Sequence, residues 1–466
     1  MKGKVMNRDS KNRNTLSNRR EFLASTTALA AFTIIPRHVL AQSGEQAPSD
    51  RMNIGCVGVG GMQGGNDVRS VSSENIYALC DVDENHLNQT AMKYEDSHPK
   101  LYRDFRVMLD REYKNLDGIT ITIPDHMHST VALWAMERGL HVYCQKPLTQ
   151  TIWEARLLSK AAKKYNVVTQ MGNQGLSSRQ TREVCEIIWS GEIGNVREVH
   201  SWSGGGFSRG VTEWPAAEEV PDTLMWDLWT GRAREHCYSS KIHPINWRGF
   251  QEYGSQMVGD WGIHMLGPAN WALQLDSPVS VECTAVKGVN PVTYPHYSCK
   301  MEFPERPNQY VPSNKMPPVT VYWYEGEMSR NFEPPEELAK EDIENMNALF
   351  VGSKGYLGTG GHGNRYSLLP KSKMEDYQLP EPVLERSPGH FDQWIQACKE
   401  GGKPCSDFSI AGPYTEWILL GSICWRFPNE KLMWDGKNMR FTNNEKANEY
   451  VRPYMRKGWE LHDIEI

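Results

Sequence analysis

Between residues 52 and 171 the chain alternates short apolar runs with longer polar or amphipathic stretches. The apolar runs are the length of buried strands, and the stretches between them repeat apolar residues at helical spacing. Strand and helix periods that alternate in this way predict a parallel, doubly wound sheet. Strands are expected at 52–57, 76–80, 118–123, 141–144 and 167–171, and helices at 84–94, 129–138 and 152–165.

The alternation stops after about residue 173. Strands are expected at 196–202, 279–286, 297–303 and 319–324, with irregular connections between them. Residues 327–347 and 366–384 are polar and interrupted by Pro and Met, so we expect loops there. Because 466 residues are too many for one hydrophobic core, the chain is expected to form two domains.

The first 41 residues have the pattern of an export signal. A basic stretch contains Arg19 and Arg20 and is followed by the apolar run 23–35, which is too short to cross a bilayer. The twin-arginine pair predicts export of the folded protein to a bacterial periplasm. Residues 42–51 are interpreted as a linker. The alternatives are an uncleaved amphipathic anchor and a disordered tail. No other segment reaches 18 apolar residues, so we expect no stable membrane insertion after cleavage.

Charge and cysteine spacing exclude several function classes. The net charge is −6, made up of +6 in residues 1–41 and −12 beyond them, so binding to nucleic acid is not expected. The ten cysteines include no CxxC pair and no Cys/His spacing typical of zinc, so we expect no metal. Because a protein folded before export first meets a reducing cytosol, we expect mostly free thiols.

The first apolar run leads directly into a glycine-rich turn. Glycines allow the backbone to turn tightly and to approach a pyrophosphate, whose charge the helix N-terminus stabilises. Asp81 ends the second strand 23 residues after Gly58, where a carboxylate can accept hydrogen bonds from both ribose hydroxyls. An acid there disfavours a 2′-phosphate, so NAD(H) is expected over NADP(H). The alternative is an α/β protein that binds no nucleotide. The turn residues expected to contact the cofactor are Gly58, Gly60, Gly61, Met62 and Gln63.

Pro124 ends the third predicted strand at its carboxyl edge, where ligands bind in such sheets. Asp125, His126 and His128 follow it. Asp125 is expected either at the ligand or as the cap of the next helix, and one of the two histidines is expected near the ligand, with His128 assigned to the cofactor.

Residues 143–148, Tyr-Cys-Gln-Lys-Pro-Leu, resemble the glucose-fructose oxidoreductase/inositol dehydrogenase/MocA (Gfo/Idh/MocA) family, which carries Glu-Lys-Pro at this place. Gln145 replaces the usual acid, and Gln63 stands at the third glycine position of the turn. The resemblance implies a Rossmann domain, here 52–172, and an α/β domain with a large, mostly antiparallel sheet, here 173–466. Further motifs that carry it lie at 124–128, 172–174, 226–231, 243–250, 259–264, 402–404 and 411–413.

Oxidation of an alcohol requires a base for the hydroxyl proton and a cation beside the oxygen. Lys146 follows a strand and suits the cationic role, which the resemblance also assigns to it. Asp260 and His264 are four residues apart, hence on one face of a helix, where a carboxylate can orient an imidazole. The resemblance implies that His264 is the general acid/base and that Asp260 positions it or binds a hydroxyl. The alternative is a helix-capping Asp260 with a core His264.

A second group of residues is suited to a sugar ring, because Trp offers an apolar face and Arg or Asn can bind hydroxyls. The alternative is a structural turn formed around a His-Pro pair. We assign the substrate to His243, Asn246, Trp247, Arg248 and Gln174, and the cofactor additionally to Pro124, Gln145, Lys146 and Asn173.

The sequence therefore indicates an exported NAD(H)-dependent oxidoreductase that acts on a carbohydrate or polyol hydroxyl and retains its cofactor tightly. One alternative is a redox-neutral glycoside hydrolase or lyase that works through a 3-keto sugar. Another is a catalytically silent sugar-binding protein. By analogy with the family, we expect a homo-oligomer, a dimer or a tetramer.

Overall fold

The computed structural model of the chain describes residues 50–207 and 210–465. The predicted export signal, 1–41, and most of the predicted linker, 42–51, lie outside these residues. The fold described here is the unit that begins at Met52.

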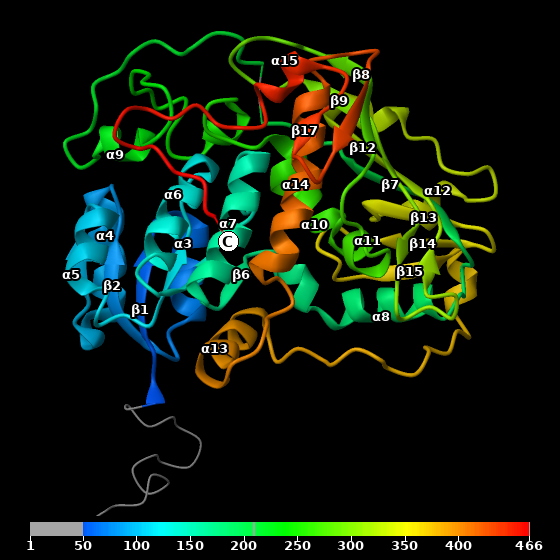
Figure 1. Cartoon of the computed structure of the whole chain (residues 1–466), viewed down its shortest axis with the longest axis horizontal. Helices are drawn as coiled ribbons and strands as arrows, with labels where there is room; N and C mark the ends of the chain where they lie inside the picture. Colours follow the sequence, from blue (N-terminus) through cyan, green and yellow to red (C-terminus); the bar gives the residue numbers. More distant parts are fainter. Residues whose placement is uncertain (1–49, 208–209, 466) are drawn as a thin grey trace, which may run out of the picture. The chain divides into compact units, whose positions relative to one another are not determined.

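The first half contains the predicted doubly wound sheet. Six parallel strands lie in the order β3-β2-β1-β4-β5-β6, which is the order of a dinucleotide-binding Rossmann fold. Strands β1, β2 and β6 of this sheet are labelled in Figure 1. The strands are β1 (Asn53–Val57), β2 (Asn75–Cys80), β3 (Lys100–Tyr102), β4 (Gly118–Ile121), β5 (His141–Cys144) and β6 (Thr169–Met171), and the helices are α3 (Gly61–Ser70), α4 (Glu84–Ala91), α5 (Phe105–Glu112), α6 (Asp125–Met136) and α7 (Ile152–Tyr165).

Two elements of this half were not predicted, the edge strand β3 and the helix α5. The carboxylate of Asp104 caps α5, because its Oδ1 accepts a hydrogen bond of 2.9 Å from the backbone N–H of Arg106. The predicted boundaries around residue 124 were wrong. β4 ends at Ile121 rather than at 123, and α6 begins at Asp125, four residues earlier than expected.

The second half contains a nine-stranded sheet in the order β15-β14-β13-β7-β12-β9-β8-β16-β17. β7 and β12 run parallel, whereas every other neighbouring pair is antiparallel, so the predicted mostly antiparallel sheet is confirmed. Its strands are β7 (Val196–Ser203), β8 (Ser280–Lys287), β9 (His296–Phe303), β12 (Val319–Glu325), β13 (Ala348–Gly352), β14 (Tyr356–Thr359), β15 (Tyr366–Leu369), β16 (Lys431–Asp435) and β17 (Arg440–Phe441).

The prediction that 366–384 is entirely a loop was wrong, because β15 pairs with β14 at the sheet edge. Shorter elements connect the strands of this half. They are α8 (Arg179–Trp189), α9 (Trp226–Thr230), α10 (Ile263–Met265), α11 (Gly267–Ala272), α12 (Lys340–Ile343), α13 (His390–Glu400), α14 (Phe408–Cys424), α15 (Glu445–Asn448), β10 (Arg306–Pro307) and β11 (Lys315–Met316).

Helix α14 lies between the two halves and packs on α7. The guanidinium of Arg156 on α7 donates from Nε to Oε1 of Glu416 on α14 over 2.7 Å, and Oγ of Ser159 donates to the carbonyl of Phe408 over 2.7 Å. The helix before it, α13, packs on the Rossmann sheet, where the ring of Phe391 stacks on Tyr143 at 4.2 Å. Residues late in the sequence therefore complete the core of the first half.

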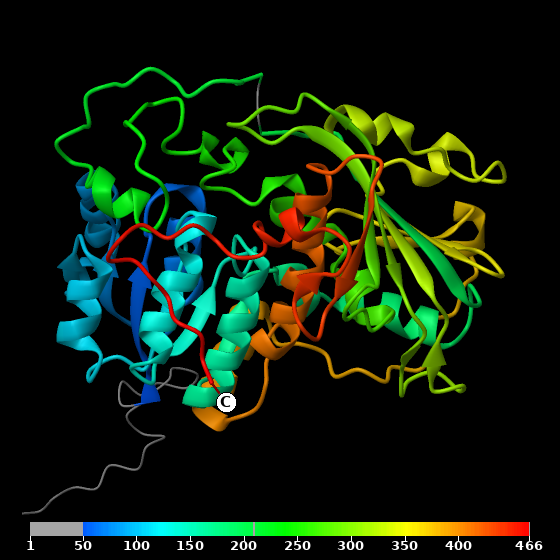
Figure 2. The same ribbon diagram turned by 45° about the horizontal axis from the view of Figure 1, so that its top comes forward.

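The C-terminal segment also returns to the first half, where it runs over the Rossmann helices (Figure 2). The backbone N–H of Trp153 donates to the carbonyl of Val451 over 3.0 Å, and the indole N–H of Trp153 donates to Asp463 over 2.7 Å. The segment is thus fastened to the start of α7.

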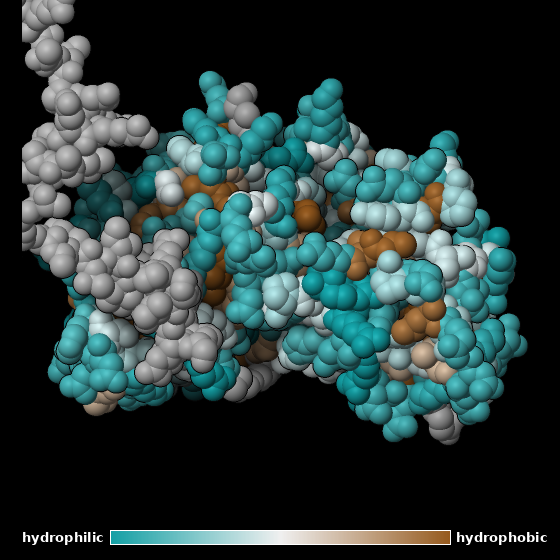
Figure 3. Space-filling view, turned by 90° about the horizontal axis from the view of Figure 1, so that it is seen from below, coloured by the Kyte–Doolittle hydropathy of each residue, from teal (hydrophilic) through white to brown (hydrophobic). Residues whose placement is uncertain are grey.

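The face shown in Figure 3 is mainly hydrophilic, and its hydrophobic residues lie in separate patches. Among the described helices, none has both the length and the apolar composition needed to cross a bilayer. All ten cysteines are free thiols, and seven of them are buried. Within the described ranges, no cluster of His, Cys, Asp and Glu is arranged to hold a metal ion.

Candidate active site

A cavity of about 720 Å³ opens at the carboxyl ends of the Rossmann strands and extends to residues of the second half. This is where ligands bind in doubly wound sheets, and the volume suits a ligand of cofactor size. Of the residues predicted from the sequence, the cavity is lined by Gly58, Gly60, Gly61, Gln63, Asp81, Pro124, Gln145, Lys146, Gln174, His243, Trp247, Arg248, Asp260 and His264.

The glycine turn forms one end of this cavity. Gly58 has φ +78°, and a Cβ there would lie 2.2 Å from the carbonyl oxygen of Thr122, so only glycine fits. Gly61, at φ +64°, begins α3, and nothing stands within 4 Å of where its Cβ would be. No side chain caps α3, so the N–H groups of its first turn are available to a pyrophosphate. The backbone of Met62 lies in this first turn.

Asp81 lies beside the turn at the end of β2. Its Oδ2 accepts hydrogen bonds from the backbone N–H groups of Val59 and Gly60, at 2.9 and 3.0 Å. Burial raises the pKa of this carboxyl. The glycine turn and the acidic residue are therefore one hydrogen-bonded unit, and a glycine turn beside an acid at the end of the second strand fits NAD.

At the other end, Lys146 forms an ion pair with Asp260. Its Nζ lies 2.6 Å from Oδ1 of Asp260 and 3.2 Å from the backbone carbonyl of the same residue. Both side chains are mostly buried. The pair holds an ammonium group in the cavity at the carboxyl end of β5.

The predicted Asp260–His264 arrangement was wrong. The two residues do not share one α-helix, because Val258–Gly262 forms a π-helical turn and α10 begins only at Ile263. In the part of the chain that the structure describes, no hydrogen bond joins Asp260 to His264, since the carboxylate is turned to Lys146 instead. Asp260 therefore orients the ammonium group of Lys146 rather than the imidazole.

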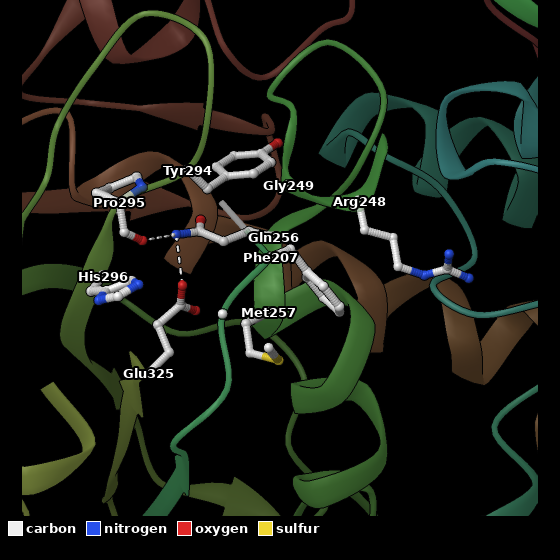
Figure 4. A pocket seen from close by; sticks show the side chains of 10 residues that line it. Phe207, Arg248, Gly249, Gln256, Met257, Tyr294, Pro295, His296 and Glu325 are labelled. Atoms are coloured by element: carbon white, nitrogen blue, oxygen red, sulfur yellow. Dashed lines mark hydrogen bonds between the residues drawn. The ribbon is translucent and has the colours of Figure 1, made fainter. Parts of the chain in front are cut away.

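A buried polar pair supports the start of this π-helical turn (Figure 4). Nε2 of Gln256 donates to Oε1 of Glu325 at 3.1 Å and to the carbonyl of Pro295 at 3.3 Å. Trp323 donates to the other carboxyl oxygen of Glu325 at 2.9 Å. Burial raises the pKa of Glu325 to about 8. These contacts link the Asp260 segment to the end of β12.

His264 is 7% exposed and lies where the cavity meets the second half. Its Nδ1 is buried and has no hydrogen-bond partner among the described residues. Burial, followed by the charge of Lys146, lowers the pKa of His264 well below its usual value. The imidazole is therefore neutral near pH 7 and able to accept a proton.

No role was predicted for His362 from the sequence, yet this residue also lines the cavity. Its ring centroid lies 4.5 Å from that of His264. The residue comes from the glycine-rich connection between β14 and β15. The run Gly360-Gly361-His362-Gly363 was the only signal that could have drawn attention to it.

Asp125, for which a capping role was considered, lines the cavity as well. Oγ of Ser255 donates to its Oδ2, and its side chain caps no helix. Burial, followed by the charge of Asp260, raises the pKa of Asp125 to about 7. It is a second acidic group within reach of the Lys146–Asp260 pair.

Two family models match consecutive parts of the chain. The model described as "Oxidoreductase family, NAD-binding Rossmann fold" matches residues 52–173, and its partner, "Oxidoreductase family, C-terminal alpha/beta domain", matches residues 189–297. The chain belongs to the Gfo/Idh/MocA oxidoreductase family. The resemblance noted in the sequence is thereby confirmed, and the first half is an NAD-binding domain.

Curated members of the Gfo/Idh/MocA family match part of the chain. Myo-inositol 2-dehydrogenase of Thermotoga maritima is 26% identical over 145 residues, which are 31% of this chain and 42% of that protein. Inositol 2-dehydrogenase of Salmonella typhimurium is 26% identical over 182 residues, 38% of this chain and 52% of that protein. The chain thus spans about half the length of the curated relatives that it matches.

Solved structures of the family share the fold over most of the chain. An inositol dehydrogenase homolog from Azotobacter vinelandii, complexed with NADH and myo-inositol, has a TM-score of 0.55 and 17% identity, covering 82% of this chain and 98% of that one. Aldose-aldose oxidoreductase from Caulobacter crescentus has a TM-score of 0.55 and 15% identity, covering 82% and 100%. These likenesses show a common fold.

The two departures from the Gfo/Idh/MocA pattern meet at one buried carboxylate. Gln63 donates to Oδ1 of Asp67 at 2.6 Å, and Gln145 donates to Oδ2 at 2.8 Å. Thr122 donates to Oδ2 as well. Burial raises the pKa of Asp67 to about 6. Both glutamines therefore donate hydrogen bonds to the carboxyl group of Asp67, which lies on α3, the helix that follows the glycine turn.

Three residues expected at ligands do not line the cavity. His128 is buried, and its two ring nitrogens each lie 2.8 Å from a backbone carbonyl, those of Pro147 and Ile123. Asn173 is buried and accepts a hydrogen bond from Ser406. Asn246 begins a short 3₁₀ turn outside the cavity. His126 is also buried, with Nε2 at the carbonyls of Trp229 and Thr230, so neither histidine of this segment faces the cavity.

Proposed function

We propose that the protein is an NAD-dependent oxidoreductase that oxidises a hydroxyl group of a carbohydrate or polyol. One observation carries the proposal. A single cavity joins the glycine turn and Asp81 to the side chains of Lys146, Asp260 and His264. An alcohol dehydrogenase needs this combination of a dinucleotide cradle, a fixed cation and a neutral base.

Bound NAD supplies an acceptor for the hydride of the carbinol carbon. Lys146 stabilises negative charge on the substrate oxygen, because its ammonium group is fixed in a mostly buried site. Asp260 holds the ammonium in place. His264 accepts the hydroxyl proton, since its lowered pKa leaves the ring unprotonated near neutral pH.

The substrate end suits a hydroxylated ring. The guanidinium of Arg248 lies 4.3 Å from the ring centroid of Trp247, and both residues line the cavity with His243 and Gln174. An aromatic face beside several hydrogen-bond donors is a common way to bind a sugar. The names of relatives, inositol dehydrogenases and levoglucosan dehydrogenase, support the same substrate class.

We further propose that the protein is exported folded to the periplasm with its cofactor already bound. The twin-arginine pattern of residues 1–41 supports export. Because free NAD is scarce outside the cytosol, a dehydrogenase that released NADH after each turnover would stop. A non-exchanging cofactor is regenerated within the site, so the net reaction is ping-pong or redox-neutral.

Mass spectrometry of the purified, denatured protein tests cofactor retention. We expect a co-purifying NAD(H) and turnover of a sugar from a substrate panel without added NAD. Steady release of free NADH in excess external NAD would refute retention. Failure to oxidise any carbohydrate or polyol would refute the proposed activity. A cleaved glycoside with no net oxidation would assign the redox-neutral alternative instead.

We also propose that copies of the chain associate through the nine-stranded sheet. Half-buried aromatic residues stack on its outer face, where the rings of His200 and Tyr322 lie 4.6 Å apart. Light scattering after gel filtration is the test, with a dimer or tetramer expected and a monomer contradicting the proposal.

A further inference from the structure

The base assigned to the reaction is mostly buried, and its exposed edge faces the cavity that substrate and NAD would fill. His264 is 7% exposed, and its buried Nδ1 has no partner among the described residues. A base that takes a proton in every turnover must also release one in every turnover, and a buried ring needs a neighbour to carry that proton. The groups packed around His264 therefore determine how the ring loses its proton and returns to the neutral form.

Three titratable groups bear on the pKa of His264, namely Lys146, His362 and His390. Lys146 is engaged with Asp260 in an ion pair. His390 is buried, with Nε2 at the carbonyl of Met171 and Nδ1 at the hydroxyl of Ser177. His362 is the exposed member of the three. It is therefore the group through which a proton can reach solvent.

The rings of His362 and His264 are in contact. Their centroids lie 4.5 Å apart with the planes inclined by 45°, and Trp261 packs against both rings at 5.2 and 6.2 Å. Partial burial, followed by the charge of Lys146, lowers the pKa of His362 below its ordinary value, so this ring too is neutral near pH 7.

The turn that carries His362 is fixed at several points. The N–H of Gly363 donates to the carbonyl of Gly360, and the carbonyl of Gly363 accepts from the hydroxyls of Ser178 and Thr181 at 3.2 and 3.3 Å. Gly175 lets the turn approach, since a Cβ at that position would lie 1.9 Å from the carbonyl oxygen of His362. The ring is thus presented to His264 by a supported backbone.

We propose that His362 carries protons between His264 and the solvent. This inference rests on the proposed function. The O–H bond of the substrate breaks and its proton goes to His264, while the hydride goes to the NAD of that function. The imidazolium of His264 then passes a proton to His362, directly or through one water, and His362 releases it to the solvent. Both rings end neutral, as they began.

Replacing the ring by one that cannot carry a proton tests the relay. His362→Phe keeps an aromatic side chain against Trp261 and removes both nitrogens. In about 2 mM buffer we expect its turnover to fall roughly 10-fold, and to recover several-fold as imidazole is raised to about 100 mM, because a small base can replace the lost relay. Wild-type turnover should be independent of buffer concentration. His98→Asn, an exposed histidine outside the cavity, is the matched control.

A second readout does not require activity. In ¹⁵N-histidine NMR of the purified protein, we expect the ring proton of His264 to exchange with solvent at least about 10-fold more slowly in His362→Phe than in wild type or His98→Asn. Equal exchange rates, or a loss of turnover that no buffer restores, would overturn the relay. If no sugar is oxidised by the wild type but the exchange slows as expected, the proposed substrate class fails and the relay stands.

Discussion

Nε of Arg248 lies 3.7 Å from Oδ1 of Asp260, the same oxygen that pairs with Nζ of Lys146 at 2.6 Å. Two cations therefore share one mostly buried carboxylate. If either cation is removed, the other still compensates the charge, so this acid is not left unpaired. The arrangement separates the contribution of Lys146 to catalysis from its contribution to the fold.

Lys146→Ala should consequently preserve the fold and reduce turnover by roughly 100-fold or more, the size expected when electrostatic stabilisation of a substrate oxygen is lost. Steady-state kinetics with the panel sugar, together with the NAD content and the melting temperature, provide the measurement. Lys93→Ala, on an exposed surface, is the control. Turnover close to wild type would remove Lys146 from the mechanism.

His264→Ala is expected to lower turnover by a similar factor, roughly 100-fold, because proton abstraction then lacks its base. NAD binding should change little, since the glycine turn and Asp81 are at the other end of the cavity. Isothermal titration of the apo-protein checks binding, and kinetics check turnover. A variant that loses NAD affinity as much as turnover would contradict the assignment of His264 as the base.

Cofactor choice should depend on Asp81. A 2′-phosphate beside this carboxylate would meet like-charge repulsion and lose a ribose hydrogen bond, at a cost of roughly 1–3 kcal/mol. We expect the wild-type apo-protein to bind NAD at least about 10-fold more tightly than NADP. In Asp81→Asn this ratio of affinities should be smaller. Titration of both cofactors measures the ratio. Tighter binding of NADP by the wild type would refute the prediction.

Gln145 should be intolerant of the acid that the family usually has at this position. In Gln145→Glu a second carboxylate replaces the amide that donates to Asp67, so two buried acids face each other with one donor fewer, at roughly 1–3 kcal/mol. Adding Asp67→Asn supplies a donor and should recover most of that free energy of unfolding. Urea denaturation of both single variants and the double variant completes the cycle. Additive effects would mean that the two positions are not coupled.

Ionisation of Glu325 should lower stability as pH rises from about 4.5 to about 8. Burial raises the pKa of this carboxyl from its ordinary value of 4.5 to about 8, so across this window the folded protein holds a proton that the unfolded chain releases. Glu325→Gln should remove this contribution, so the free energy of unfolding at pH 8 relative to pH 5 should exceed that of the wild type by more than about 1 kcal/mol, since one pKa unit corresponds to about 1.4 kcal/mol. Urea unfolding at pH 5 and pH 8 measures it, with the exposed Glu327→Gln as control. The same slope in both variants would exclude Glu325 as the source.

The Rossmann half could be predicted because its strands are short apolar runs buried on both faces, as β4 is. Strand β3 was not predicted, because it has only three residues, two of them exposed, at the edge of the sheet. Helix α5 does carry a sequence signal, because Asp104 is followed by apolar residues at 105, 108 and 109, a pattern typical of a capped amphipathic helix.

Residues that follow strands were placed correctly in the cavity, because the carboxyl ends of parallel strands meet at one edge. Asp81 and Lys146 are of this kind. The relation of Asp260 to His264 was not predictable from α-helical spacing, since a π-helical turn intervenes. His362 reaches the cavity only because the nine-stranded sheet brings its turn there, which no local pattern encodes.

The contacts of α13 and of residues 451–463 with the Rossmann half restrict how far the two halves can move apart. A hinge motion that separated the two halves would have to break the stack of Phe391 on Tyr143. It would also have to break the hydrogen bonds of Trp153 to Val451 and Asp463. Loss of each of these contacts exposes apolar surface or breaks a hydrogen bond, so a wide separation of the halves costs free energy. This restraint supports the proposed retention of the cofactor, because a bound dinucleotide would have to leave the cavity without a wide separation of the two halves.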